Sequence, residues 1–238
     1  RVPFRISPRH DHGIDRMTAV WLLPIVPAEV AAASGGLLIP HLTDPAARLD
    51  VLVASYALWA VSVPLALGIL VILVLRMALH KLPEARMAAT SWLALGPLGT
   101  GALGLLLLGE AAPGALGGMG LGAYGDAFRG ASLLGALLLW GYGLWWLATA
   151  TLATIRQTRL GLPFNLGWWG YTFPLGVFTL ATLRLAGLLP IQALSDFGHL
   201  LTAILAGAWI IVAARTARGA WSGALFCAPC LTPEEARA

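Results

Sequence analysis

The 238-residue sequence has little charge, little cysteine and a single lysine. Only 11% of its residues are charged, whereas a typical soluble domain has about 25%. So few charges cannot cover a globular surface, which excludes a cytosolic enzyme, a disordered chain and a nucleic-acid-binding module. Two cysteines are too few for a disulfide scaffold. The lysine, Lys81, lies in a polar connection, which excludes a pigment that needs an intramembrane lysine.

Long apolar runs dominate the sequence instead. Hydrophobic residues make up 58% of the chain and the mean hydropathy is +0.80. A helix that spans a bilayer needs about 20 mostly apolar residues. Six segments meet this requirement and predict an all-α integral membrane protein with six transmembrane helices, at 19–39, 51–75, 88–108, 130–154, 167–188 and 197–214. Transmembrane strands would be about half as long and would alternate in polarity.

The basic residues divide unequally between the two sides that these six segments define. Twelve of the 15 lie in the N-terminal segment 1–18, in the loops after the second and fourth segments, or in the tail 215–238. The other three are Arg48, Arg129 and Arg184. The positive-inside rule makes the first side cytoplasmic. We therefore expect a transmembrane domain over 19–214 with both ends of the chain in the cytoplasm.

A repeat links the first, third and fifth apolar segments. In each, a tryptophan (Trp21, Trp92, Trp169) precedes a proline (Pro27, Pro97, Pro174) by five or six positions. The prolines recur once per pair of segments, so the unit is a helical hairpin repeated three times. A proline inside a helix frees a carbonyl that lipid cannot satisfy, so kinked helices that line a water-filled path are one interpretation. The other is that proline and glycine are simply common in membrane helices.

The fifth segment resembles the signature of a known transporter family. The residues are Phe164-Asn165-Leu166-Gly167-Trp168-Trp169-Gly170-Tyr171-Thr172-Phe173-Pro174-Leu175-Gly176-Val177-Phe178. They are similar to the motif of the tellurite-resistance/dicarboxylate transporter family, which includes slow-type anion channels, malate transporters and sulfite efflux pumps. Two further stretches resemble motifs of the same family, Trp21-Leu22-Leu23-Pro24-Ile25-Val26-Pro27 and Leu95-Gly96-Pro97-Leu98-Gly99.

The resemblance implies a fold of ten helices, arranged as five hairpins around a central pore and assembled as a homotrimer in the plasma (inner) membrane. This chain would supply the last three hairpins, as the C-terminal part of a longer protein. The implied function is transport of small anions, such as C4-dicarboxylates, sulfite or tellurite, without catalytic residues, a cofactor or a metal. Phe173 matches the family's pore-blocking phenylalanine. From the sequence alone, packing of Phe173 against neighbouring helices is the alternative.

Glu29 is the one acidic residue deep inside an apolar run. A charge there is costly, so such a residue faces a cavity, pairs with a cation or is protonated. In the repeat it occupies the position of Gly99 and Gly176, two residues after the proline, which predicts a place near the pore. Three interpretations stay open: proton coupling, an ion pair with Arg184 or another arginine, and packing.

Other polar residues have two interpretations each. Arg184 would either attract anions to an outer vestibule or anchor its helix at the membrane surface. The hydroxyls of Thr100 and Thr172 would either contact an anion or satisfy carbonyls near the prolines, and the glycines would leave open volume or allow close packing. Cys227 and Cys230 leave a second class of function open, a membrane redox or sensor protein without transport activity.

Overall fold

The computed structural model describes residues 13–14, 17–79, 85–159, 161 and 164–223. Within these ranges every regular element is a helix, which confirms the all-α prediction. The α-helices are α2 (Val26–Leu38), α3 (Pro45–Leu79), α4 (Leu95–Gly117), α5 (Gly122–Thr158), α6 (Phe173–Leu188) and α7 (Gln192–Trp221). Short 3-10 helices flank them: η2 (Ala19–Leu22), η3 (Ile39–His41), η4 (Ala85–Ala94) and η5 (Leu166–Tyr171).

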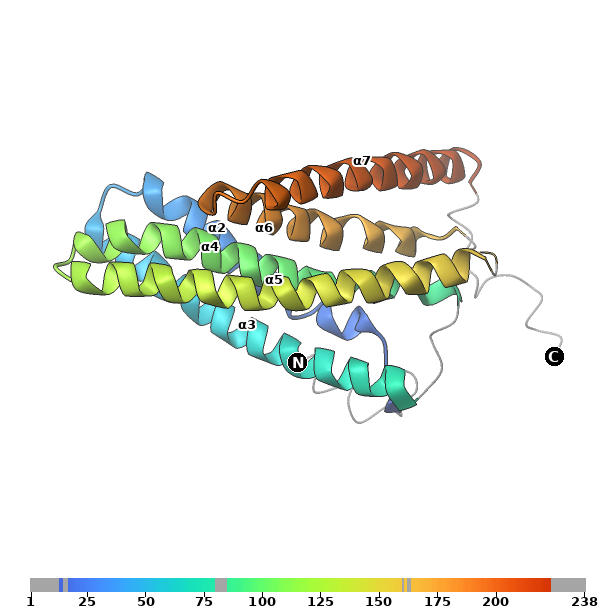
Figure 1. The fold of residues 1–238 in the computed structure, drawn as a ribbon, viewed down its shortest axis with the longest axis horizontal. Helices are drawn as coiled ribbons and strands as arrows, with labels where there is room; N and C mark the ends of the chain where they lie inside the picture. The colour runs from blue at the N-terminus through green and yellow to red at the C-terminus, as the bar shows by residue number, and fades with distance from the viewer. Residues whose placement is uncertain (1–12, 15–16, 80–84, 160, 162–163, 224–238) are drawn as a thin grey trace.

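The helices pack as three consecutive hairpins, α2–α3, α4–α5 and α6–α7, along one long axis (Figure 1). Helix α4 is the centre of the bundle and contacts α2, α3, α5 and α6. In its most apolar stretch 89% of the residues are buried, against 28% in α3 and 17% in α7. The second helix of each hairpin therefore lies on the outside, and the first lies toward the middle.

In the part of the chain that the structure describes, five helical stretches are long and apolar enough to cross a membrane, and they confirm five of the six predicted segments. They are Pro45–Leu79, Ala89–Gly117, Gly122–Thr158, Leu166–Leu188 and Gln192–Trp221. Four of them extend well beyond the predicted ends, because an α-helix continues after the apolar run stops. In particular, α7 continues to Trp221, past the predicted start of the tail at 215.

The first predicted segment, 19–39, is not one continuous α-helix. It consists of η2, a turn, the 13 residues of α2 and then η3. At about 1.5 Å per residue α2 is roughly 20 Å long, shorter than the roughly 30 Å hydrocarbon core of a bilayer. The prediction of a sixth full-length spanning helix is therefore wrong for α2 taken alone.

The three prolines of the repeat lie where a 3-10 helix or a turn leads into an α-helix. Pro27 and Pro174 are the second residues of α2 and α6, and Pro97 is the third residue of α4. Proline fits this first turn because the first N–H groups of a helix have no intrahelical partner. Within the longer helical stretches Ala89–Gly117 and Leu166–Leu188, Pro97 and Pro174 mark the change from 3-10 to α-helix, and the role of the three prolines as pore kinks stays a prediction. Prolines do occur inside described α-helices, but at Pro64 and Pro113.

The tryptophans of the second and third repeats tie each inner helix to its own outer helix. The indole N–H of Trp92 donates to Thr154 of α5 (2.9 Å), and that of Trp169 donates to Thr216 of α7 (3.2 Å). Trp92 also meets Tyr171 edge to face, with 5.6 Å between ring centroids. The repeated Trp-to-Pro pattern therefore encodes the start of an inner helix and its attachment to the outer ring.

The described arginines gather mainly at one end of the bundle. Helices α3, α5 and α7 all end there, at the right of Figure 1, and their last turns carry Arg76, Arg156 and Arg218. Because the outer helices run in the same direction, basic residues from three loops meet at one surface. This arrangement is the one that the loop-by-loop division of charge predicted.

Candidate functional site in the inner helices

Phe173 lies at the start of α6 and is not a core residue. Its side chain is 49% exposed, whereas Phe178, five residues later, is fully buried. A Cβ atom built on Gly96 of α4 would lie 3.9 Å from the Phe173 ring, so the ring lies beside the start of α4. It also borders a hollow of about 640 Å³ with Thr172 and, from α7, Trp209. A bulky ring between the starts of two inner helices can narrow a passage there.

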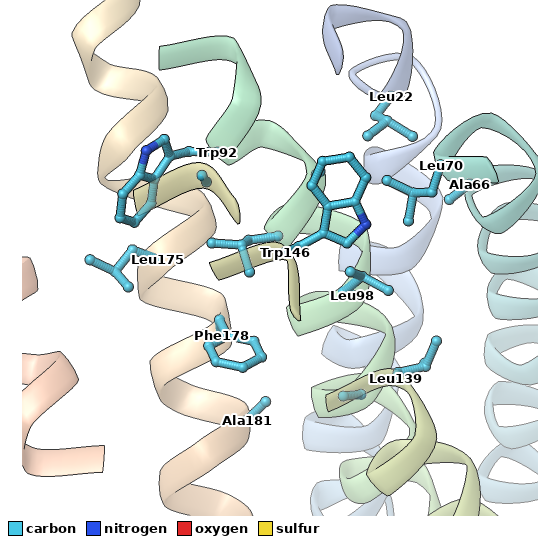
Figure 2. Close-up of a cluster of buried hydrophobic side chains, with 14 of the residues drawn as sticks. Leu22, Ala66, Leu70, Trp92, Leu98, Leu139, Trp146, Leu175, Phe178 and Ala181 are labelled. Atoms are coloured by element: carbon cyan, nitrogen blue, oxygen red, sulfur yellow. The ribbon is translucent and has the colours of Figure 1, made fainter. Parts of the chain in front are cut away.

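Gly99 lies at a close approach of two inner helices. A Cβ atom at this position would lie 2.6 Å from the backbone nitrogen of Phe178, so any side chain would push α4 and α6 apart. The Phe178 ring stacks on Trp140 of α5, with 6.4 Å between centroids and 5° between planes. Figure 2 shows Phe178 on α6 within this buried cluster. Of the two interpretations of the glycines, close packing describes Gly99.

Gly176 lies toward α7, since a Cβ atom there would meet Leu205 at 3.6 Å. Thr172 donates its hydroxyl to the carbonyl of Trp169 (2.8 Å). Thr179 and Thr182 donate in the same way to Leu175 and Phe178, at 2.7 and 2.8 Å. Hydroxyls along α6 therefore satisfy backbone carbonyls, the second of the two interpretations considered for threonines near the prolines.

Glu29 is fully buried, and its carboxyl meets a hydroxyl rather than a cation. Ser62 Oγ of α3 lies 2.8 Å from Glu29 Oε1 and 2.9 Å from the carbonyl oxygen of Ile25. Among the described residues, Glu29 Oε2 has no hydrogen-bond partner. A hydroxyl carries one hydrogen, so it cannot donate to both the carbonyl and an ionised carboxylate. A protonated Glu29 resolves the conflict, because it donates to Ser62 and Ser62 donates to Ile25.

Thr100 is a second buried polar residue of this region that has an unpartnered oxygen among the described residues. It is 2% exposed, and its Oγ1 has no partner among the described residues. Helices α2 and α4 run parallel, because Gly36 packs on Leu107 and Ala33 packs on Gly104, three residues earlier on each helix. One turn further back, this register brings Thr100 to the level of Glu29. Two buried polar groups without a full set of partners thus lie at the same depth.

Arg184 pairs with Glu110, a residue that sequence reasoning missed. Arg184 Nε donates to Glu110 Oε1 at 2.9 Å, and a second contact joins Nη2 to Oε2. The bidentate pair joins α6 to α4, and its side chains are 46% and 24% exposed. The predicted alternative of an ion pair between Glu29 and Arg184 is therefore wrong. Glu110 follows the predicted end of its apolar segment by two residues, so it was not recognised as part of a helix.

The described helices match a known family along nearly the whole chain. A family model described as voltage-dependent anion channel matches residues 2–217, which include all six α-helices except the last turn of α7. The chain belongs to the voltage-dependent anion channel family. This family contains channels and transporters rather than enzymes, and its members are multi-pass membrane proteins. The resemblance inferred from the Phe164–Phe178 signature is confirmed.

Individual relatives agree with this assignment. The chain is 38% identical over 229 residues to a protein named sulfite efflux pump in Arthroderma otae, and equally to its namesake in Trichophyton rubrum. It is 29% identical to an uncharacterized transporter of Methanocaldococcus jannaschii. These matches cover 94% of this chain and 60 to 63% of the relatives, so the chain spans less than two thirds of their length. No solved structure matches the chain.

Proposed function

We propose that this protein moves small anions across the membrane, with sulfite as the first substrate to test. Two relatives that are 38% identical over most of the chain are named sulfite efflux pumps, and the family is one of anion channels. The observation that carries the proposal is Phe173, a half-exposed ring at the start of an inner helix, beside the start of the next. A bulky apolar ring at a constriction can gate a pore by blocking and dewetting.

The finer architecture follows the family. We propose a pore of ten helices in five hairpins, to which this chain contributes three, with α2, α4 and α6 toward the pore. The assembly would be a homotrimer in the plasma membrane, with the arginine-rich end in the cytoplasm. The clustering of Arg76, Arg156 and Arg218 at one end supports this orientation through the positive-inside rule.

Replacing Phe173 with alanine tests the gate. In liposomes that contain the full-length protein, Phe173→Ala should raise sulfite flux at least several-fold, because the half-exposed ring no longer narrows the passage. Phe128→Ala is the matched control, since Phe128 on α5 is similarly exposed (40%) and lies against Tyr56. Equal flux in wild type and Phe173→Ala would overturn the gate assignment.

Competition by other anions then identifies the substrate. Malate, tellurite, chloride and nitrate are each added in excess to the sulfite flux assay. The anion that inhibits sulfite flux most strongly competes best for the path and indicates the preferred substrate class. Absence of flux for every anion would favour the alternative of a membrane sensor or redox protein. Cys227 and Cys230, on which the redox alternative depends, lie outside the described residues.

Glu29 is proposed as the site that couples flux to protons. Its neutral form completes the hydrogen bonds from Glu29 through Ser62 to Ile25, and an ionised form would lack donors in an apolar interior. Among the described residues of α3 and α4, which pack against α2, Ser62 is the hydrogen-bonding partner of Glu29, and the one acidic group on α4, Glu110, pairs with Arg184. Release of the proton would thus require a change in this packing.

The variant Glu29→Gln tests this coupling. The amide keeps the shape of the neutral acid and can donate to Ser62 Oγ, so folding should persist, but it cannot release a proton. We expect the pH dependence of sulfite flux to flatten, while Glu110→Gln, the matched carboxylate control, keeps the wild-type profile. Flux that keeps its full pH dependence in Glu29→Gln would remove the coupling role and leave the anion path unaffected.

A further inference from the structure

The inner helices α2 and α4 face each other along small residues, and the gap between them widens toward Glu29. A Cβ atom built on Gly36 of α2 would lie 2.8 Å from Leu107 Cβ of α4, which is closer than two side chains can approach. One turn nearer to Glu29, a Cβ atom on Gly104 of α4 would lie 3.8 Å from Ala33 of α2, which is ordinary van der Waals contact. The two helices thus separate in the direction of Glu29.

Glu29 and Thr100 occupy the next level of this interface, one turn before Ala33 and Gly104. Both side chains are buried, with 0% and 2% of their surface exposed. Glu29 Oε2 and Thr100 Oγ1 each lack a hydrogen-bond partner among the described residues. Because buried oxygens are nearly always hydrogen-bonded, two such oxygens at one level point to a partner that they share.

Helix α3 packs across both inner helices at this level. Ser62 Oγ lies 2.8 Å from Glu29 Oε1, and the next residue, Val63, would meet a Cβ atom on Gly101 of α4 at 3.0 Å. One turn earlier, the indole N–H of Trp59 donates to the carbonyl of Gly101 (2.9 Å). Adjacent residues of α3 therefore contact the glutamate on α2 and the sequence neighbour of the unpartnered threonine on α4.

No ion is at hand to serve the two oxygens. The described titratable and charged residues of the elements that pack against α2 are His41 of η3, Arg48, Asp50, Tyr56 and Arg76 of α3, and Glu110 of α4. Tyr56 hydrogen-bonds to Ser132 of α5, and Glu110 pairs with Arg184. The others lie at least about three helical turns away along the chain. The shared partner must accept from the threonine hydroxyl and donate to the carboxyl oxygen, and water does both.

We propose that one buried water molecule joins Glu29 Oε2 to Thr100 Oγ1 and makes Thr100 a positioning residue for Glu29, which rests on the proton coupling proposed above. In the neutral state the Thr100 hydroxyl donates to the water, and the water donates to Oε2. When Glu29 gives its proton to solvent, the water stays as a donor, and the Ser62 hydroxyl turns from the Ile25 carbonyl to Oε1. The Ile25 carbonyl keeps the Ala28 N–H (3.3 Å). Thr100 thus holds the second donor that the carboxylate needs.

Infrared difference spectroscopy of the purified full-length protein tests the water bridge without a transport measurement. The carboxylic-acid C=O stretch of Glu29 is identified by its loss in Glu29→Gln. Thr100→Val keeps the branched shape but removes the hydroxyl, so this stretch should move to higher frequency, and Thr100→Ser should restore it. A water O–H stretch that responds to heavy-oxygen water should disappear in Thr100→Val. The matched control is Thr179→Val, because the buried Thr179 hydroxyl donates to the Leu175 carbonyl of its own helix.

Sulfite flux in liposomes separates the bridge from the coupling. Thr100→Val should raise the pH of half-maximal flux by about one unit, a ten-fold change in proton concentration, since an ionised carboxylate loses a donor. Thr100→Ser and Thr179→Val should keep the wild-type profile. An unmoved C=O stretch in Thr100→Val, an equal shift in Thr179→Val, or a shift without any response of a water band would overturn the bridge. A moved stretch with an unchanged pH profile would confirm the bridge and overturn the proton coupling.

Discussion

Among the described residues, the carboxyl groups of Glu110 and Glu29 both lie on inner helices, and their surroundings differ. Glu110 of α4 is partly exposed and forms a bidentate ion pair with Arg184 of α6. Glu29 of α2 is fully buried and meets only the hydroxyl of Ser62 among the described residues. Glu110 is therefore held by an ion pair, and Glu29 by a hydrogen bond to one hydroxyl. The comparison teaches that two carboxyl groups of one bundle differ in partner and burial, which is the difference on which the proposed coupling role of Glu29 depends.

The largest expected effect comes from placing a permanent charge at Glu29. Glu29→Arg would bury a guanidinium, which cannot lose its proton, where the structure offers one hydroxyl, and should destabilise the fold by at least about 3 kcal/mol. Size-exclusion chromatography in detergent should show loss of the folded species. Glu110→Arg, partly exposed beside Arg184, should still yield folded protein. If both variants fold equally well, Glu29 does not lie in a sealed interior.

A smaller loss of stability is expected when the Ser62 hydroxyl that hydrogen-bonds Glu29 is removed. Ser62→Ala removes the described hydrogen-bond partner of the Glu29 carboxyl and leaves the Ile25 carbonyl with the Ala28 N–H (3.3 Å), which should cost about 1–3 kcal/mol. The measurement is the thermal unfolding midpoint of the purified protein. Ser34→Ala is the control, because the exposed Ser34 hydroxyl bonds only to the Val30 carbonyl of its own helix. Equal midpoints for the two variants would contradict the relay from Glu29 to Ile25.

The smallest effect is expected at the ion pair. Glu110→Gln should cost below about 1 kcal/mol, because Arg184 is 46% exposed and water can solvate it after the charge of Glu110 is removed. Combining Glu110→Gln with Arg184→Gln should add little to the loss, which a double-mutant cycle on thermal unfolding measures. A loss larger than that of Ser62→Ala would reverse the order proposed for the two carboxyl groups.

Hydropathy predicted six spanning helices, and five of them are confirmed within the described residues, because apolar length is a local property of the chain. It misjudged the ends of α3, α4, α5 and α7, since helical hydrogen bonding continues where the apolar run stops. It also treated 19–39 as one helix, although the short α2 lies between 3-10 segments there. The Phe164–Phe178 signature identified the family, and the match over residues 2–217 confirmed it.

The candidate site was predictable only in part. Glu29 stood out because a carboxyl in an apolar run is rare and costly, but Ser62 lies 33 positions away and resembles any other serine in a helix. Arg184 was found, and its partner was not, because Glu110 lies 74 positions earlier and outside the predicted segment. The roles proposed for Phe173 and Glu29 in transport remain predictions that the variants above will test.

The sequence alone determined the membrane class, the hairpin repeat and the family, because these depend on apolar length, spacing and short motifs within single segments. Only the tertiary structure decided how the charges and hydroxyls are paired. It assigned Glu110 to Arg184 and Ser62 to Glu29, and it used Gly99 for packing against Phe178. These pairings depend on which faces of distant helices meet. A helix that is apolar on nearly every side does not show in its own sequence which face will pack against a given partner helix.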